Sequence, residues 1–311
     1  MTITAIVPTF RRPADLKRCL GGLDTQTRLA DEVVVVLRRD DAPTHEALDG
    51  YESDRLSIRR VIVDTPGVVA ALNAALDVAR GEILAFTDDD CVPRPEWLER
   101  LTAQFASDPN IGGVGGPDWT HAHGSVYDDS VGVCGSVQWF GRIDGSACLR
   151  GTPCDVDILK GCNMSFRRNA VGSIRFDARL AGSGAQMFNE FAFCLAVRRA
   201  KWRLVWDPKA TVDHFPGARF DEDQRGAFVY GAHVNAVHNR TLLLLTHLPL
   251  PNRLAYLTYA ALFGSRPWPG LAWLPARVWK RNPDAVRYWR ATVSGHARGL
   301  RTFAASSHPD P

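Results

Sequence analysis

The sequence predicts an α/β fold built on a mixed, mostly parallel sheet with helices on both faces, followed by a C-terminal helical segment. Short apolar runs alternate with helical patterns over the first 115 residues of the 311-residue chain. Strands that alternate with helices of this length are typical of a parallel sheet covered on both sides. A composition of 45% hydrophobic and 23% charged residues is that of a globular protein with a sizeable core.

Five strands and three helices are expected in this first part. Apolar runs predict strands over Ile3–Pro8, Glu32–Leu37, Ser57–Val63, Glu82–Thr87 and Ile111–Gly115. Helical spacing of apolar residues predicts helices after Pro13 and over Gly67–Arg80 and Pro95–Ser107. Ligands of such sheets bind beyond the carboxyl ends of the strands. The segment 8–12, the loop after Leu37 and the triplet Asp88-Asp89-Asp90 are therefore expected on one rim.

The rest of the chain divides into three further parts. Residues 116–160 are rich in Gly and Asp and resemble an irregular insertion. A strand-like segment begins at Gly161, a helix is expected over 188–200, and short extended segments cover 202–206 and 210–213. Beyond Phe220 the pattern becomes helical. We therefore expect an α/β domain over 1–218, a helical segment over 219–303 and a disordered tail over 304–311.

The Asp triplet at the end of an apolar strand is the sharpest local signal. In an extended chain Asp88 and Asp90 would face one way and Asp89 the other. Two converging carboxylates suit Mg²⁺ or Mn²⁺, which prefer hard oxygen ligands and often share phosphate oxygens. The structural alternative is a solvated acidic loop that precedes the helix at Pro95.

Four segments, in order, resemble a known family. They read IVPTFRRPADLKRCLGGL from Ile6, GVVAALNAALDVARGEILAFTDDDCVPRPEWLERL from Gly67, LKGCNMSFRRNAV from Leu159 and FNEFAFCLAVRRAKWRLVWDPKATVDHFPG from Phe188. Together they resemble the family 2 glycosyltransferases, enzymes of the GT-A fold that use nucleotide-diphospho-sugars and invert the anomeric configuration. The resemblance covers about residues 1–218.

The resemblance implies a role for each matched site residue. It implies that Glu190 is the catalytic base, that Asp88, Asp90 and His214 hold Mn²⁺ or Mg²⁺, and that the donor contacts Pro8, Thr9, Arg11, Asn73, Asp88 and Asp89. The bound metal would stabilise the charge on the departing diphosphate, and a single base with no second nucleophile implies inversion. A surface Glu and a packing His are the structural alternatives for Glu190 and His214, and Asp213 competes as ligand or as the group that orients the His214 ring.

The sequence departs from the family pattern in two places. The Asp that commonly follows the second strand and contacts the base is missing, since that place is occupied by Leu37-Arg38-Arg39. Asp40, slightly later, is the plausible substitute. The usual Glu-Asp pair of the catalytic helix is Asn189-Glu190. No Q-x-x-R-W motif is present, which favours single additions over polymerisation. The helix dipole would keep Glu190 ionised, and the helix beginning at Gly67 could offer backbone amides to a phosphate.

The C-terminal segment is basic and aromatic. Residues 251–303 contain nine Lys or Arg residues, one acid and four tryptophans. Such a segment can lie on an anionic membrane surface, or its helices can simply pack on the core. No apolar run reaches 18 residues, so no membrane span is expected. We expect a cytoplasmic protein, at the inner face of the cell membrane if the segment binds lipid, with no nucleic-acid partner.

The acceptor and the donor sugar are left open. A glycan, a glycolipid or a polyprenol-linked sugar would each supply the acceptor hydroxyl. Two other functions compete with glycosyl transfer: nucleotidyl transfer on a related fold, and an inactive membrane-associated interaction protein. The seven cysteines are scattered, with no C-x-x-C and no zinc-type spacing with His, which indicates reduced thiols packed in a cytosolic protein.

Overall fold

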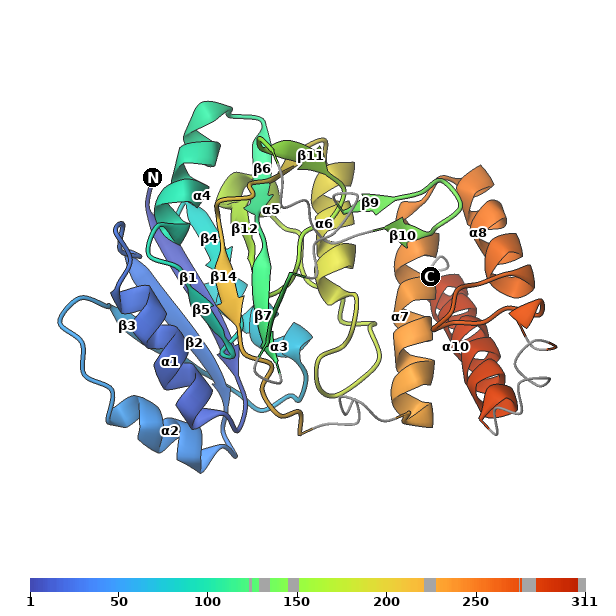
Figure 1. Cartoon of the computed structure of the whole chain (residues 1–311), viewed down its shortest axis with the longest axis horizontal. Helices are drawn as coiled ribbons and strands as arrows, with labels where there is room; N and C mark the ends of the chain where they lie inside the picture. Colours follow the sequence, from blue (N-terminus) through green and yellow to red (C-terminus); the bar gives the residue numbers. More distant parts are fainter. Residues whose placement is uncertain are drawn as a thin grey trace.

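A mixed eight-stranded sheet forms the centre of the protein (Figure 1). The computed structural model describes residues 1–122, 125–128, 135–144, 151–220, 228–273, 275 and 284–306. The strand order is β11 (Cys154–Val156), β13 (Arg203–Trp206), β6 (Ile111–Gly115), β12 (Met164–Arg167), β4 (Ile83–Phe86), β1 (Ile3–Thr9), β2 (Glu32–Arg38) and β3 (Ile58–Val63). β4, β1, β2 and β3 run parallel, whereas β12 is antiparallel to both of its neighbours. The predicted fold class is confirmed.

Helices cover both faces of this sheet because each central strand is apolar on both sides. In β2, Val33 and Val35 pack into the cluster under α1 (Pro13–Asp24) and α4 (Trp97–Ser107). Val34 and Val36 point the other way, into the cluster under α3 (Val68–Val78) and α6 (Asn189–Arg199). Successive side chains of a strand alternate between faces, so one uninterrupted apolar run serves two layers of helices.

The loops hold more structure than the sequence predicts. Asp41 caps α2 (Ala42–Asp49) by accepting a hydrogen bond from the Thr44 N–H at 3.3 Å. The segment 116–160 contains β7 (Asp118–Ala122), β8 (Ser125–Asp128), β9 (Ser136–Val137) and β10 (Ile143–Asp144) in addition to β11. A second sheet has the order β5 (Cys91–Pro93), β14 (Val212–His214), β7 and β8. It joins the end of the Asp triplet to the strand that carries His214.

The C-terminal helices pack on each other and on the α/β domain. They are α7 (Tyr230–His247), α8 (Leu250–Leu262) and α10 (Ala285–Ser306), and Figure 1 shows them together on the side of α6. Gly295 and Gly299 let α10 approach α7, since a Cβ at either position would lie within 3 Å of Val237 or Thr241. α10 extends through Ser306, two residues beyond the predicted start of the tail at 304, and residues 307–311 lie outside the described part of the chain.

The remaining features of the fold are a short helix after β12 and the hydropathy of the helices. The short helix α5 (Arg168–Val171) follows β12 directly. Among the helices that the structure describes, none has both the length and the hydropathy needed to cross a bilayer.

Candidate active site

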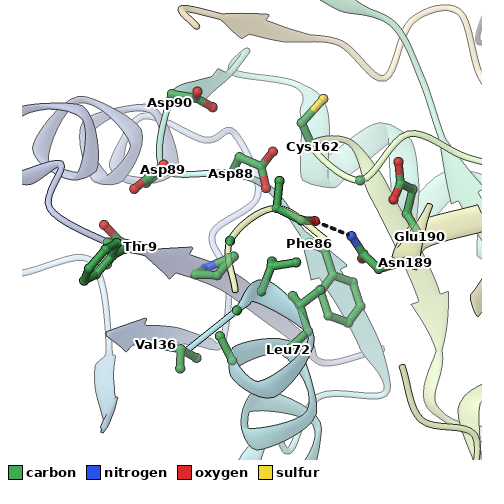
Figure 2. Close-up of a pocket in the computed structure, with 18 of the residues that line it drawn as sticks. Thr9, Val36, Leu72, Phe86, Asp88, Asp89, Asp90, Cys162, Asn189 and Glu190 are labelled. Carbon is green, nitrogen blue, oxygen red and sulfur yellow. Dashed lines mark hydrogen bonds between the residues drawn. The ribbon is translucent and has the colours of Figure 1, made fainter. Parts of the chain in front are cut away.

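A pocket of about 560 Å³ opens at the carboxyl ends of β1, β2 and β4. It collects residues from the whole α/β domain, among them Pro8, Thr9, Asp88, Asp89, Asp90, Glu190 and His214. Figure 2 shows Asp88 and Glu190 on two sides of the pocket, with Cys162 beside them. The expected rim is therefore present, and it contains most of the residues that the sequence singled out.

The three aspartates do not follow the alternation expected of an extended strand, because β4 ends at Phe86 and the chain turns at Asp89 and Asp90. One guanidinium nitrogen, Nη1 of Arg12, lies 2.8 Å from Asp89 Oδ1 and 3.0 Å from Asp90 Oδ2. The Gly217 N–H also donates to Asp90 Oδ2, at 2.9 Å. Asp89 and Asp90 are thus fixed by one arginine, and Asp88 is left facing the pocket (Figure 2).

His214 reaches the triplet through the second sheet. In the β5–β14 ladder it lies opposite Cys91, the residue after the triplet. Its Nε2 is 3.5 Å from Asp90 Oδ1, and its Nδ1 is 3.4 Å from Asp118 Oδ2. Asp118 is also paired with Lys160. The sequence did not single out Asp118, which lies in the weakly patterned segment after β6.

Asp213, which we considered as the ligand or the orienting group, is engaged elsewhere. Its carboxylate accepts two hydrogen bonds from Arg94, both at 2.9 Å, and lies 2.8 Å from His121 Nε2. It does not line the pocket. The carboxylate beside the His214 ring is that of Asp118.

The charges in this cluster are only partly compensated. Burial raises the pKa of Asp88 to about 6, with the Asp90 charge adding to the effect. Burial also raises the pKa of Asp89 to about 7, although Arg12 opposes it. Burial would raise the pKa of Asp90 too, but His214 and Arg12 hold it well below its ordinary value. Burial lowers the pKa of His214, but its carboxylate neighbours outweigh this and raise it to about 10. The carboxylates of this cluster therefore favour the charged forms of Arg12 and His214.

Glu190 is the second residue of α6 and lines the pocket. Burial raises its pKa to about 7, and the charge of Asp88 acts in the same direction. The expectation that the helix dipole keeps Glu190 ionised is therefore wrong at pH values below about 7. Phe188, the residue before α6, adopts a left-handed backbone conformation with φ of 72°. Gly161 lies beside the Glu190 side chain, since a Cβ at Gly161 would be 3.6 Å from the Glu190 Cβ. A carboxyl group that titrates near neutrality is suited to general-base chemistry.

The predicted donor-binding residues divide into two groups. Pro8, Thr9, Asp88 and Asp89 line the pocket. Arg11, Asp40 and Asn73 do not.

These three side chains have other partners. The Arg11 guanidinium lies over the Phe10 ring, 4.9 Å from its centroid. Asp40 is exposed and accepts two hydrogen bonds from Arg38, at 3.0 and 2.9 Å. The Asn73 amide both donates to and accepts from the backbone of Phe176, at 2.9 Å each. Asn73 therefore anchors a loop instead of facing the donor side.

The N-terminus of α3 is also occupied. The Val68 N–H donates to the Gly184 carbonyl at 2.9 Å, and the Val69 N–H donates to Gln186 Oε1 at 3.0 Å. A Cβ at Gly67 would lie 2.3 Å from the same Gln186 oxygen. The loop before α6 thus takes the place at which a phosphate was expected.

Comparison with known proteins identifies the family. The model of the family "Glycosyl transferase family 2" matches residues 4–175. The glycosyltransferase AglE of Haloferax volcanii is 29% identical over 128 residues, which are 40% of this chain and 42% of AglE. Validoxylamine A glucosyltransferase of Streptomyces hygroscopicus is 32% identical over 108 residues, 33% of this chain and 25% of that protein. The chain thus spans less than half the length of these two relatives.

Solved structures share the fold at low sequence identity. The mannosyltransferase PcManGT of Pyrobaculum calidifontis, in complex with GDP-Man and Mn²⁺, superposes with a TM-score of 0.56 at 18% identity. The superposition covers 98% of this chain and 86% of the PcManGT chain. TarS of S. aureus, in complex with UDP-GlcNAc, superposes with a TM-score of 0.54 at 14% identity, over 99% of this chain and 92% of the TarS chain. With the family model matching more than half of its residues, this chain belongs to glycosyl transferase family 2.

Proposed function

We propose that the protein transfers a single sugar from a nucleotide-diphospho-sugar to an acceptor hydroxyl, with inversion and with Mn²⁺ or Mg²⁺ as cofactor. The observation that carries the proposal is that one pocket joins the pair Asp88 and Asp90 with His214 and, across from them, Glu190. Membership in the family argues against nucleotidyl transfer. An inactive protein would not need this set of carboxylates in one pocket, since uncompensated buried charge is costly.

The residues present fit a divalent cation. Two carboxylates and an imidazole form a donor set of oxygen and nitrogen atoms that suits Mn²⁺ and, with fewer protein ligands, Mg²⁺. A bound cation would act as a Lewis acid on the diphosphate leaving group. Mn²⁺ is present in the complex of PcManGT, which supports the choice of ion.

The side chains around the cation site would hold it in shape. Arg12 fixes Asp90 through Oδ2, which leaves Oδ1 on the side of His214. Asp118 faces the other ring nitrogen of His214, at 3.4 Å, and attracts the ring electrostatically. Second-layer contacts of this kind set the orientation of ligands and their affinity for metal.

Glu190 would remove the proton from the acceptor hydroxyl. It lies in the same pocket as Asp88, and its pKa of about 7 lets it accept a proton near neutral pH. In the proposed mechanism one carboxylate acts as the base and none acts as a nucleophile. The acceptor hydroxyl therefore attacks the sugar directly, and the anomeric centre is inverted.

The acceptor or its carrier would be presented at a lipid surface. The outward positions of α8 carry no charge: Leu250 and Leu254 are 66% and 60% exposed, and Phe263 after the helix is 57% exposed. On α10, the exposed residues Val286, Val293 and Leu300 recur every seven positions, among several arginines. Apolar strips flanked by basic residues favour anionic membrane surfaces.

An assay with a panel of labelled nucleotide sugars tests the proposed reaction. We expect sugar transfer, or slow hydrolysis of one donor, that requires Mn²⁺ or Mg²⁺ and stops when EDTA is added. Metal-independent turnover, or exchange of pyrophosphate into a nucleotide, would contradict the proposal.

Vesicle sedimentation tests the membrane contact separately. We expect the protein to bind vesicles that contain phosphatidylglycerol and to be released by high salt, and Leu254→Glu to weaken this binding. Because α7 packs on α6 and α10 packs on α7, point variants are preferable to truncation. Exposed Glu46 on α2 provides the control substitution Glu46→Gln, and equal binding of wild type and Leu254→Glu would exclude α8 as the contact.

A further inference from the structure

Two cysteines and a histidine lie close together beside the Asp triplet, although their spacing in the sequence is not that of a metal motif. Cys91 follows Asp90 directly, Cys162 precedes β12, and His214 lies opposite Cys91 in the β5–β14 ladder. Their ligand atoms, the two Sγ atoms and a ring nitrogen, all lie within 4.8 Å of one another. Both thiols are buried, at 0% and 7% exposure.

A fourth donor stands next to these three. Asp90 Oδ1 is 3.9 Å from Cys91 Sγ and 3.5 Å from His214 Nε2. Zinc bond lengths of about 2.0–2.3 Å place the ligand atoms of a tetrahedral site roughly 3.3–3.8 Å apart. The three donors of the cluster are therefore within about an ångström of tetrahedral spacing. Asp90 lies next to two of them, and movement of its side chain would bring its carboxylate in as the fourth ligand.

The donor types decide which cation fits. Thiolates select Zn²⁺ and similar thiophilic ions, whereas Mg²⁺ and Mn²⁺ prefer oxygen ligands. We propose that Cys91, Cys162 and His214, with Asp90 as the fourth ligand, form a binding site for a thiophilic divalent cation that overlaps the catalytic Mn²⁺ or Mg²⁺ site. On binding, the cation forms two metal–sulfur bonds, one bond to a ring nitrogen of His214 and one to the carboxylate of Asp90. The two thiol protons and the second ring proton of the charged His214 imidazole pass to the buffer.

The two sites cannot be filled independently, because they share His214 and Asp90. A thiophilic cation would withdraw both ligands from the catalytic site and leave Asp88 without its partners. Zn²⁺ or Cd²⁺ is therefore an inhibitor of the transferase. This consequence rests on the proposed function, whereas the binding itself does not.

A titration of the reduced, metal-free protein with Cd²⁺, in a phosphine reductant and without any sugar donor, tests the binding. We expect an ultraviolet thiolate-to-cadmium absorption band that saturates at one equivalent, with protons released to the buffer. Cys91→Ser and Cys162→Ser should each weaken the binding about tenfold or more. Cys154→Ser, at a half-buried cysteine outside the cluster, should leave it unchanged.

Two results would overturn the site. One is the lack of a thiolate band in the wild-type protein; the other is a band that persists unchanged in both Ser variants. Circular dichroism of each variant checks that it is folded, and Cys162→Ala replaces Cys162→Ser if the latter is not. Because no donor is present, the outcome is independent of whether the protein transfers sugar. Inhibition of Mn²⁺-supported turnover by Cd²⁺ is then measured as a separate experiment.

Discussion

Replacing Glu190 by Gln distinguishes the effect of the buried carboxylate on folding stability from its proposed role as the general base. The substitution keeps the size of the side chain and the helix, but it removes the group that accepts the proton. In the folded protein the pKa of Glu190 is raised from 4.5 to about 7, chiefly by burial. That difference corresponds to roughly 3 kcal/mol of unfavourable ionisation free energy.

The sign of the stability effect follows from the raised pKa. Below about pH 4.5 Glu190 is neutral in both the folded and the unfolded chain, so it imposes no penalty. Between pH 4.5 and 7 the unfolded chain releases the proton first, and the folded state loses stability until the penalty is complete above pH 7. We therefore expect Glu190→Gln, without metal, to be more stable than wild type at pH 8 and similar to it near pH 4.5.

Although Glu190→Gln is expected to raise stability at pH 8, we expect it to lower the catalytic rate. We expect kcat to fall about 10²–10⁴-fold, the usual contribution of a positioned base, while KM for the donor changes little. Wild-type activity should decline as the pH falls through about 7, and the residual activity of the variant should not show this limb. Glu46→Gln, the same change on an exposed helix position, is the control.

The assay combines initial rates across pH with thermal unfolding at pH 4.5 and 8. A Glu190→Gln enzyme that keeps more than about a third of the wild-type kcat would remove Glu190 from the mechanism. Asp213, the nearest carboxylate to His214 in the sequence, could not then act as the base, because Arg94 and His121 hold its carboxylate outside the pocket.

Three further substitutions probe the site. Asp90→Ala should abolish metal-dependent binding of a nucleoside diphosphate in calorimetry; unchanged dependence on Mn²⁺ would refute the metal site. Arg12→Gln should destabilise the metal-free protein by on the order of 3 kcal/mol, because the buried carboxylates of Asp89 and Asp90 lose their shared guanidinium. Mn²⁺ should then raise the melting temperature of this variant more than that of wild type. Asn73→Ala should lower stability by about 1–2 kcal/mol through two lost hydrogen bonds to Phe176, with donor affinity unchanged; a large loss of affinity would restore Asn73 to the donor site.

The sequence by itself determined the fold class and the location of the site. Uninterrupted apolar runs such as that of β2 can be buried on both faces only in a sheet covered by helices, so the pattern specified the architecture. The ends of β1 and β4 then placed Pro8, Thr9 and the Asp triplet on one rim, because parallel strands end at the same edge. Family motifs supplied the expectation for Glu190 and His214, and the pocket contains both.

Only the tertiary structure decided which side chains meet. Asp118 and Cys162 lie 96 and 52 positions before His214 in the sequence. Asp118 reaches His214 through the pairing of β7 with β14, and Cys162 through the approach of the segment before β12; local sequence patterns carry no signal for either contact. The pKa of Glu190 likewise depends on burial by distant segments, which outweighs the helix dipole that its sequence position suggested. Charge and hydrogen-bond partners are fixed by packing in three dimensions, and this is why Asp40, Asn73 and Asp213, plausible by position, lie outside the pocket.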